Sequence, residues 1–173
     1  NVTKGYFGAD AETARAFEDG WFHTGDVGEL GPDGQLFIRG RKKEMIVTPE
    51  GLNVFPEDVE RVLNHLPGVR DSAVVGIANG GEERVNAVLV LDAGINPDDV
   101  LRAANAQLGD AQRIRRVHVW PEPELPRTDG TRKLKRAVIR DWARSGGAGA
   151  APVGAGADTL SALVAKYSGR ADL

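Results

Sequence analysis

The sequence contains no cysteine. Disulfide bonds, thiolate zinc sites and thiol nucleophiles are therefore excluded, and a metal site would have to use histidine and carboxylate side chains. A chain without cysteine is compatible with a reducing compartment, so we expect a cytoplasmic protein.

Long hydrophobic runs are also absent. The longest purely apolar runs are four to five residues, as at 87–91, whereas a helix needs about 20 apolar residues to cross a bilayer. We therefore expect no membrane span. The chain begins with neither a methionine nor a signal-peptide pattern, so we expect it to be part of a longer protein.

Charge is nearly balanced but unevenly distributed. The 173 residues are 41% hydrophobic and 27% charged with a net charge of −3, which is typical of a soluble globular chain of about one domain. Residues 127–144 contain seven basic and two acidic side chains, so this segment carries +5 and the rest carries −8. An acidic body and a basic run whose only aromatic residue is Trp142 argue against nucleic-acid binding.

The N-terminal 41 residues predict a short helix and a β-hairpin. Residues 9–18 are rich in helix formers and are followed by Asp-Gly. The segments 21–30 and 35–40 are rich in aromatic and β-branched residues, and the Pro-Asp-Gly between them favours a tight turn. A hairpin of this size cannot bury a core alone.

Residues 56–143 predict an α+β domain. Pro56 and Pro97 each open an amphipathic helix at its favoured first position. The strands expected are 72–77, 85–91 and 114–120, and a last helix is expected at 134–143. This order, α-β-β-α-β-α, predicts a small mixed sheet covered by helices.

The C-terminal part has a different composition. Residues 145–157 are mostly Ala and Gly and predict a flexible linker, whereas 158–167 carry an apolar stripe at helical spacing. We therefore divide the chain into four parts: 1–41, 42–144, 145–157 and 158–173.

Three groups of residues could carry chemistry. Asp26 and Arg41 end two predicted strands and could bind the hydroxyls of a ribose, although a turn Asp and a surface Arg would look the same. Lys133 lies in a polar loop before the last helix, as a movable charge suited to a phosphate or carboxylate, or as part of a solvated face. The segments 40–44 and 48–56 could form a hinge and a turn-rich loop, or simply a linker.

The histidines, His23, His65 and His118, have no partners at metal-ligand spacing. We therefore expect no metal site in this chain.

Taken in order, these segments resemble the C-terminal part of the adenylate-forming enzymes, the superfamily of acyl-CoA synthetases, peptide-synthetase adenylation domains and firefly luciferase. The matching motifs are GWFHTGD at 20–26, GRKKEMI at 40–46, GLNVFPEDVE at 51–60, and LPRT at 125–128 running on to Lys133. Lys4-Gly5-Tyr6 also matches, so the resemblance covers about 1–143. It is greatest to a long-chain fatty acyl-CoA ligase.

The resemblance implies a two-step reaction. A carboxylic acid, expected to be a fatty acid, reacts with ATP and Mg²⁺ to form an acyl-adenylate, and the acyl group then passes to the thiol of CoA or of a carrier-bound phosphopantetheine. Residues 1–41 would end a large N-terminal domain, 42–144 would be the mobile C-terminal domain, and 158–173 would begin an acyl-carrier domain. The phosphate loop and acyl pocket of the family lie in the large domain, so we expect this chain alone to be inactive.

The resemblance also assigns roles to individual residues. Asp26 and Arg41 match the ligands of the ATP ribose, and Lys43 matches the hinge position. The loop of Gly51 and Asn53 matches the segment that approaches the thiol. Lys133 matches the lysine that contacts the carboxylate and the α-phosphate.

One position departs from the family pattern. The family commonly has Gly directly before the lysine, and this chain has Arg132, as do some long-chain acyl ligases. The register could therefore place Lys135 in the catalytic role, and we choose Lys133.

Two other functions fit the sequence. One is an acyl-AMP ligase that loads a carrier protein. The other is a non-catalytic module whose basic tail binds nucleic acid or a protein partner.

Overall fold

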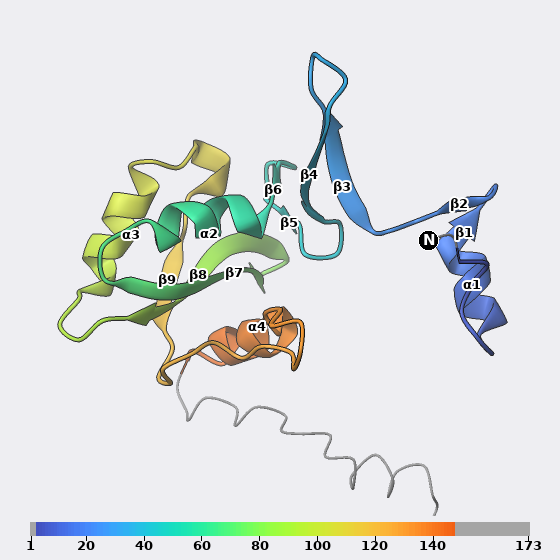
Figure 1. Ribbon diagram of the computed structural model, residues 1–173. Helices are drawn as coiled ribbons and strands as arrows, with labels where there is room; N and C mark the ends of the chain where they lie inside the picture. The colour runs from blue at the N-terminus through green and yellow to red at the C-terminus, as the bar shows by residue number, and fades with distance from the viewer. Residues whose placement is uncertain (1–2, 148–173) are drawn as a thin grey trace, which may run out of the picture. The chain divides into compact units, whose positions relative to one another are not determined.

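The computed structural model describes residues 3–147, and the chain divides into two compact units at Met45 and Ile46 (Figure 1). Each unit is described by itself. The helix predicted at 158–167 and most of the predicted linker lie outside the described residues. The four-part domain division stays a prediction.

The first unit consists of one helix and two small antiparallel pairs of strands. Helix α1 (Asp10–Ala16) leads into β1 (Phe17–Glu18), which pairs with β2 (Trp21–Phe22). The turn between β1 and β2 is Asp19-Gly20, with φ of 50° and 82°, as a two-residue hairpin of right-handed twist requires. Because of this turn, residues 21–22 pair with residues 17–18. The first strand of the predicted hairpin, expected to begin at residue 21, therefore begins only at Asp26.

The predicted hairpin is formed by β3 (Asp26–Leu30) and β4 (Leu36–Arg41). Its turn is closed by hydrogen bonds from the N–H of Gly34 to the carbonyl of Gly31 (2.9 Å) and from the N–H of Gly31 to the carbonyl of Gln35 (2.8 Å). The Pro-Asp-Gly turn expected from the sequence is therefore confirmed. The register places Asp26 directly opposite Arg41.

The second unit is a three-stranded mixed sheet between two layers of helices (Figure 1). Strands β7 (Val69–Asn79) and β8 (Glu82–Leu91) pair antiparallel through a Gly80-Gly81 turn, and β9 (Arg116–Val119) joins β8 in parallel. Helix α3 (Pro97–Asn105) and the 3-10 turn η1 (Asp110–Gln112) form the crossover between β8 and β9. This confirms the expected α+β fold with a small mixed sheet.

The two faces of the sheet are covered by different helices. Alternate side chains along β7 and β8, such as Val74 and Leu89, pack against α2 (Pro56–Asn64) and α3. The intervening ones, such as Ala73 and Val88, pack against α4 (Arg136–Arg144). A short antiparallel pair, β5 (Ile46–Val47) and β6 (Asn53–Val54), precedes α2, and residues 48–52 join its two strands.

Candidate functional site

Asp26 and Arg41 lie side by side at one end of the β3–β4 hairpin. The Arg41 Nε atom is 3.0 Å from the Asp26 carboxylate, and its Nη1 donates to the carbonyl of Thr24 at 2.7 Å. Both side chains remain partly exposed. The hairpin register thus produces a carboxylate and a guanidinium in one place, which is the pair needed to accept from and donate to the hydroxyls of a sugar.

A hollow borders this pair within the first unit. It is lined by residues of α1, of the β1–β2 hairpin and of the strand that follows, including His23, Thr24, Asp26 and Lys42. His23 Nε2 is 3.1 Å from the Glu18 carboxylate, so this histidine has an acidic partner inside the unit. The Gly25 backbone has φ of 76° in this segment, which suits glycine and turns the chain into β3.

Lys43 lies in a turn immediately after β4. The N–H groups of Glu44 and Met45 donate to the carbonyl of Arg41 at 3.0 and 3.1 Å, and the Lys43 side chain is exposed. The division between the two compact units falls two residues later. The hinge role of Lys43 stays a prediction.

Gly51 lies in the loop that joins β5 to β6, and Asn53 is the first residue of β6. The Thr48 N–H donates to the Leu52 carbonyl at 2.9 Å, and the Gly51 N–H donates to the Thr48 carbonyl at 2.8 Å. Gly51 has φ of 77° and open space where a Cβ would lie, and Gly51 and Asn53 are both exposed. A hydrogen bond from the Thr48 side chain holds the pKa of Glu50 below its usual value.

This loop forms one wall of a groove in the second unit. The groove is also lined by the start of β8 and by the segment around η1, including Arg84, Arg113 and Arg115. Arg84 is paired with Glu82, and Arg113 with Asp110 at 3.2 Å. The loop at 48–52 therefore borders a groove that three arginines help to line.

Lys133 lies in a loop that is closed like a hairpin between Arg127 and Leu134. The Thr128 N–H donates to the Lys133 carbonyl at 2.8 Å, and the Lys133 N–H donates to the Thr128 hydroxyl at 3.1 Å. The side chain is exposed, and among the residues that the structure describes its ammonium has no hydrogen-bond or ion-pair partner. The backbone of Lys133 is thus fixed while its charge is available.

The residue before this lysine has a backbone conformation that glycine adopts most readily. Arg132 has φ of 55°, in the left-handed region that glycine adopts without strain. Its guanidinium is 3.0 Å from the Glu124 carboxylate. A larger residue therefore keeps the glycine-like backbone here, which agrees with Lys133 following the usual glycine position.

Lys135 occupies a different position. It is the N-cap residue of α4, and its N–H donates to the carbonyl of Pro126 at 2.8 Å. It therefore lies at the base of the loop, beyond the bridge between Arg127 and Leu134. This geometry favours Lys133 as the residue that the loop presents.

The two loops of the second unit are anchored at opposite ends of the sheet. The loop of Lys133 is anchored where the Arg127 guanidinium binds Asp71 of β7. The loop after β5 is anchored where the N–H of Val47 donates to the side chain of Glu83 in β8, beside the cross-strand pair of Ile77 and Arg84. Asp71 and Ile77 are six residues apart on β7, which corresponds to about 20 Å along a strand.

Sequence reasoning missed the acidic residues that organise the Lys133 loop and α4. Asp71 binds Arg127, and Glu60, which is 8% exposed, binds Arg136. The only signal for Glu60 is a charged residue between two apolar positions of a helix, Val59 and Leu63. The basic run is accordingly neutralised in part within the domain, because Arg127, Arg132 and Arg136 each bind a carboxylate.

Within residues 3–147, no three histidine or acidic side chains gather as metal ligands would. In the same range, no helix is both long and apolar enough to cross a bilayer.

The chain is similar to known proteins over most of its length. Residues 58–133 match the family described as AMP-binding enzyme C-terminal domain. Over 141 residues the chain is 36% identical to the 2-succinylbenzoate–CoA ligase of Geobacillus kaustophilus, an alignment that covers 81% of this chain and 29% of that protein.

Two solved structures agree with this match. The ATP-bound structure of MatB from Rhodopseudomonas palustris is 34% identical with a TM-score of 0.73, over 83% of this chain and 29% of that one. The o-succinylbenzoate CoA synthetase of Bacillus subtilis, in complex with an acyl-adenylate intermediate, is 29% identical with a TM-score of 0.73, over 82% and 28% of the two chains. The chain thus spans less than a third of the length of these relatives.

Proposed function

We propose that this chain, whose residues 58–133 match the C-terminal domain of the AMP-binding enzymes, is the C-terminal part of an ATP-dependent acid–thiol ligase of the adenylate-forming superfamily. The ligase would convert a carboxylic acid and ATP into an acyl-adenylate and pyrophosphate, and then transfer the acyl group to a thiol with release of AMP. The observation that carries the proposal is the exposed Lys133 ammonium on a loop whose backbone is held by hydrogen bonds.

The first step needs a positive charge at the reacting groups. A carboxylate must approach the α-phosphate of ATP, and the two anions repel each other. Lys133 would place its ammonium between them, so that it stabilises the charge that develops as the bond to phosphorus forms. Mg²⁺, when bound with ATP, would offset further phosphate charge.

The first unit would hold the nucleotide at its sugar. The Asp26 carboxylate would accept hydrogen bonds from the ribose hydroxyls, and Arg41, 3.0 Å from it, would donate to the same sugar. Their cross-strand pairing supports this role, because it fixes acceptor and donor side by side before a ligand arrives.

The second step would use the end of the second unit that lies away from the Lys133 loop. The exposed loop of Gly51 and Asn53 would face the incoming thiol, and a rotation at Lys43 would exchange it for the Lys133 loop. The separation of about 20 Å between their anchor points on the sheet supports this division, since the two loops cannot occupy one reaction centre together.

For the acid, we propose a fatty acid, and for the acceptor, CoA. The fatty acid rests on the resemblance of the Arg132–Lys133 pair to long-chain acyl ligases, whereas two of the relatives reported above are named as succinylbenzoate CoA ligases. We also propose that the enzyme works in the cytoplasm.

The test is a product assay on the complete ligase that contains this chain. Fatty acids of several lengths and 2-succinylbenzoate are each offered with ATP, Mg²⁺ and either CoA or a phosphopantetheine-bearing carrier protein. We expect acyl-CoA, AMP and pyrophosphate in equal amounts with a fatty acid. Acylation of the carrier alone would identify a carrier-loading ligase, and the absence of any acid-dependent pyrophosphate release would contradict the proposal.

A further inference from the structure

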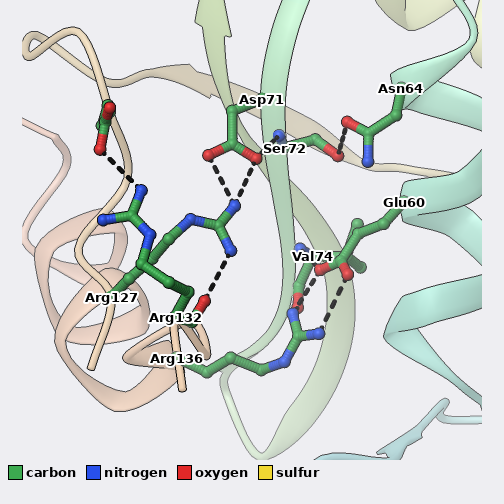
Figure 2. A network of polar contacts seen from close by, with 9 residues as sticks. Glu60, Asn64, Asp71, Ser72, Val74, Arg127, Arg132 and Arg136 are labelled. Atoms are coloured by element: carbon green, nitrogen blue, oxygen red, sulfur yellow. Dashed lines mark hydrogen bonds and ion pairs between the residues drawn. The ribbon is translucent and has the colours of Figure 1, made fainter. Parts of the chain in front are cut away.

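One arginine connects the central sheet to the loop of Lys133 (Figure 2). The Arg127 Nη2 atom donates to both carboxylate oxygens of Asp71, at 2.9 and 2.8 Å. Its Nη1 atom donates to the carbonyl oxygen of Arg132 at 3.0 Å. A single guanidinium therefore ties β7 to the peptide group directly before Lys133.

This connection is partly shielded from water. The Arg127 and Asp71 side chains are 25% and 21% exposed, and Asp71 also accepts a hydrogen bond from the Ser72 N–H at 3.0 Å. Because Nη2 contacts both carboxylate oxygens and the pair is partly desolvated, it holds its geometry better than an exposed ion pair.

Three consecutive backbone groups around Lys133 are held in this way. The carbonyl of Arg132 is bound by Arg127, and the N–H and carbonyl of Lys133 are both bound by Thr128. The Lys133 side chain thus leaves the loop from a fixed point. A lysine is flexible, so the direction in which its charge can reach depends on how firmly its backbone is held.

We propose that Asp71 and Arg127 are positioning residues for Lys133, and that they act in adenylate formation only. The inference rests on the proposed function, in which Lys133 contacts the reacting groups. Asp71 and Arg127 would not touch the substrate, and their effect would pass through the Arg132 carbonyl to the lysine backbone.

Two substitutions test the connection with little change of volume. Asp71→Asn removes the charge that orients the guanidinium. Arg127→Lys keeps a positive charge near Asp71, but one compact ammonium on a shorter reach does not take the places of the two guanidinium nitrogens, of which Nη2 binds Asp71 and Nη1 binds the Arg132 carbonyl. We expect each variant of the complete ligase to lose roughly 10- to 100-fold in the rate of ATP–pyrophosphate exchange, as displacement of a catalytic group does.

The control is Asn64→Ala. Asn64 accepts a hydrogen bond at 2.8 Å from the Ser72 hydroxyl, one residue along β7 from Asp71, and this bond leads to α2 and not to the loop (Figure 2). The Asn64→Ala substitution removes a tertiary contact of the same strand, so it shows how a loss of stability alone affects ATP–pyrophosphate exchange. We expect exchange to be unchanged in this variant.

The second readout is thioester formation from preformed acyl-adenylate. We expect Asp71→Asn and Arg127→Lys to leave it unchanged. The inference is overturned if both variants exchange at the wild-type rate while Lys133→Ala does not, or if they lose both half-reactions together as a merely unstable domain would. If Lys133→Ala itself exchanges normally, the proposed role of Lys133 fails, and the inference fails with it.

Discussion

Arg132 is the residue at which this chain departs most informatively from its family. Its φ of 55° places a long side chain in a backbone conformation that costs a non-glycine residue about 1 kcal/mol. The ion pair with Glu124 is exposed on both sides and contributes little in return. The strain lies directly beside Lys133.

We therefore predict that Arg132→Gly is more stable than Arg132→Ala by about 1 kcal/mol. Both substitutions remove the Glu124 ion pair, but only glycine relieves the left-handed backbone. Urea denaturation of the two variants measures the difference between their free energies of unfolding. Equal stabilities would mean that the loop is not strained at this position.

His118 is a second residue whose environment has a measurable consequence. It is buried in β9 beside Trp142, with ring centroids 6.3 Å apart, and its Nε2 has no partner among the described residues. Burial, and second the nearby charge of Arg116, lower the pKa of His118 below its usual 6.5.

This shift predicts a loss of stability in mild acid. At pH values between the lowered pKa of His118 in the folded state and 6.5, the unfolded chain binds the proton and the folded chain does not. The free energy of unfolding therefore falls as the pH drops from about 6.5 through this window, by at most about 1.4 kcal/mol per pH unit. Urea titrations at several pH values should show a shallower dependence in His118→Gln, and an identical slope would contradict the assignment.

Single residues with a chemical signature could be predicted from the sequence. Asp26 and Arg41 were predicted as a pair, and the cross-strand register places them together. Asp71 and Glu60 could not be predicted, because their partners, Arg127 and Arg136, lie 56 and 76 residues further along the chain. No local pattern reports contacts over such a distance.

At the scale of elements, the exposed edge of the sheet is closed by side chains. Strand β7 is an edge strand. The N–H of Val74 donates to Glu60 of α2 at 2.7 Å, and the carbonyl of Val74 accepts from Arg136 of α4 at 3.2 Å. Glu60 and Arg136 also bind each other, with Nη2 to Oε2 at 3.0 Å, so the pair links the two helix layers across the strand (Figure 2).

Breaking this link should be costly. The side chains of Glu60 and Arg136 are 11% and 12% exposed. Removal of Arg136 leaves the buried Glu60 carboxylate without its guanidinium, and removal of Glu60 breaks the closest ion pair of Arg136, whose Nη2 also lies 3.5 Å from Glu57. We predict that Glu60→Ala and Arg136→Ala each lower the free energy of unfolding by about 3 to 5 kcal/mol. The double variant should cost less than the sum by at least about 1 kcal/mol.

The matched control is the exposed pair of Asp99 and Arg102 on α3. Its removal by Asp99→Ala should cost less than about 1 kcal/mol. Chemical denaturation of all four variants provides the comparison. Additive effects at Glu60 and Arg136 would show that the two residues stabilise the domain independently.

Helices and strands with regular periodicity were predicted well, and short pairings were not. The helices expected to begin at Pro56 and Pro97 begin there in the structure, and the strands expected at 72–77 and 85–91 lie within β7 and β8. The two-residue strands β1 and β6 were missed, because so few residues show no alternation. Residues 21–22 were expected to be strand, but they pair with β1 and not within the β3–β4 hairpin. These short strands form only because the turns between them bring their partners into register.

At the scale of the whole molecule, the central claim is that two loops of the second unit serve different half-reactions. One loop presents Lys133, the other presents Gly51, and their anchors lie about 20 Å apart along β7. If the two loops serve two half-reactions in turn, then a substitution in one loop must spare the step that belongs to the other.

The most direct test measures both half-reactions in Lys133→Ala and Gly51→Leu of the complete ligase. Lys133→Ala should reduce ATP–pyrophosphate exchange by roughly 10²- to 10³-fold and leave thioester formation from preformed acyl-adenylate intact. Gly51→Leu adds bulk to an exposed turn and should do the reverse, with at least about a tenfold loss of thioester formation. A parallel loss of both steps in either variant would contradict the account.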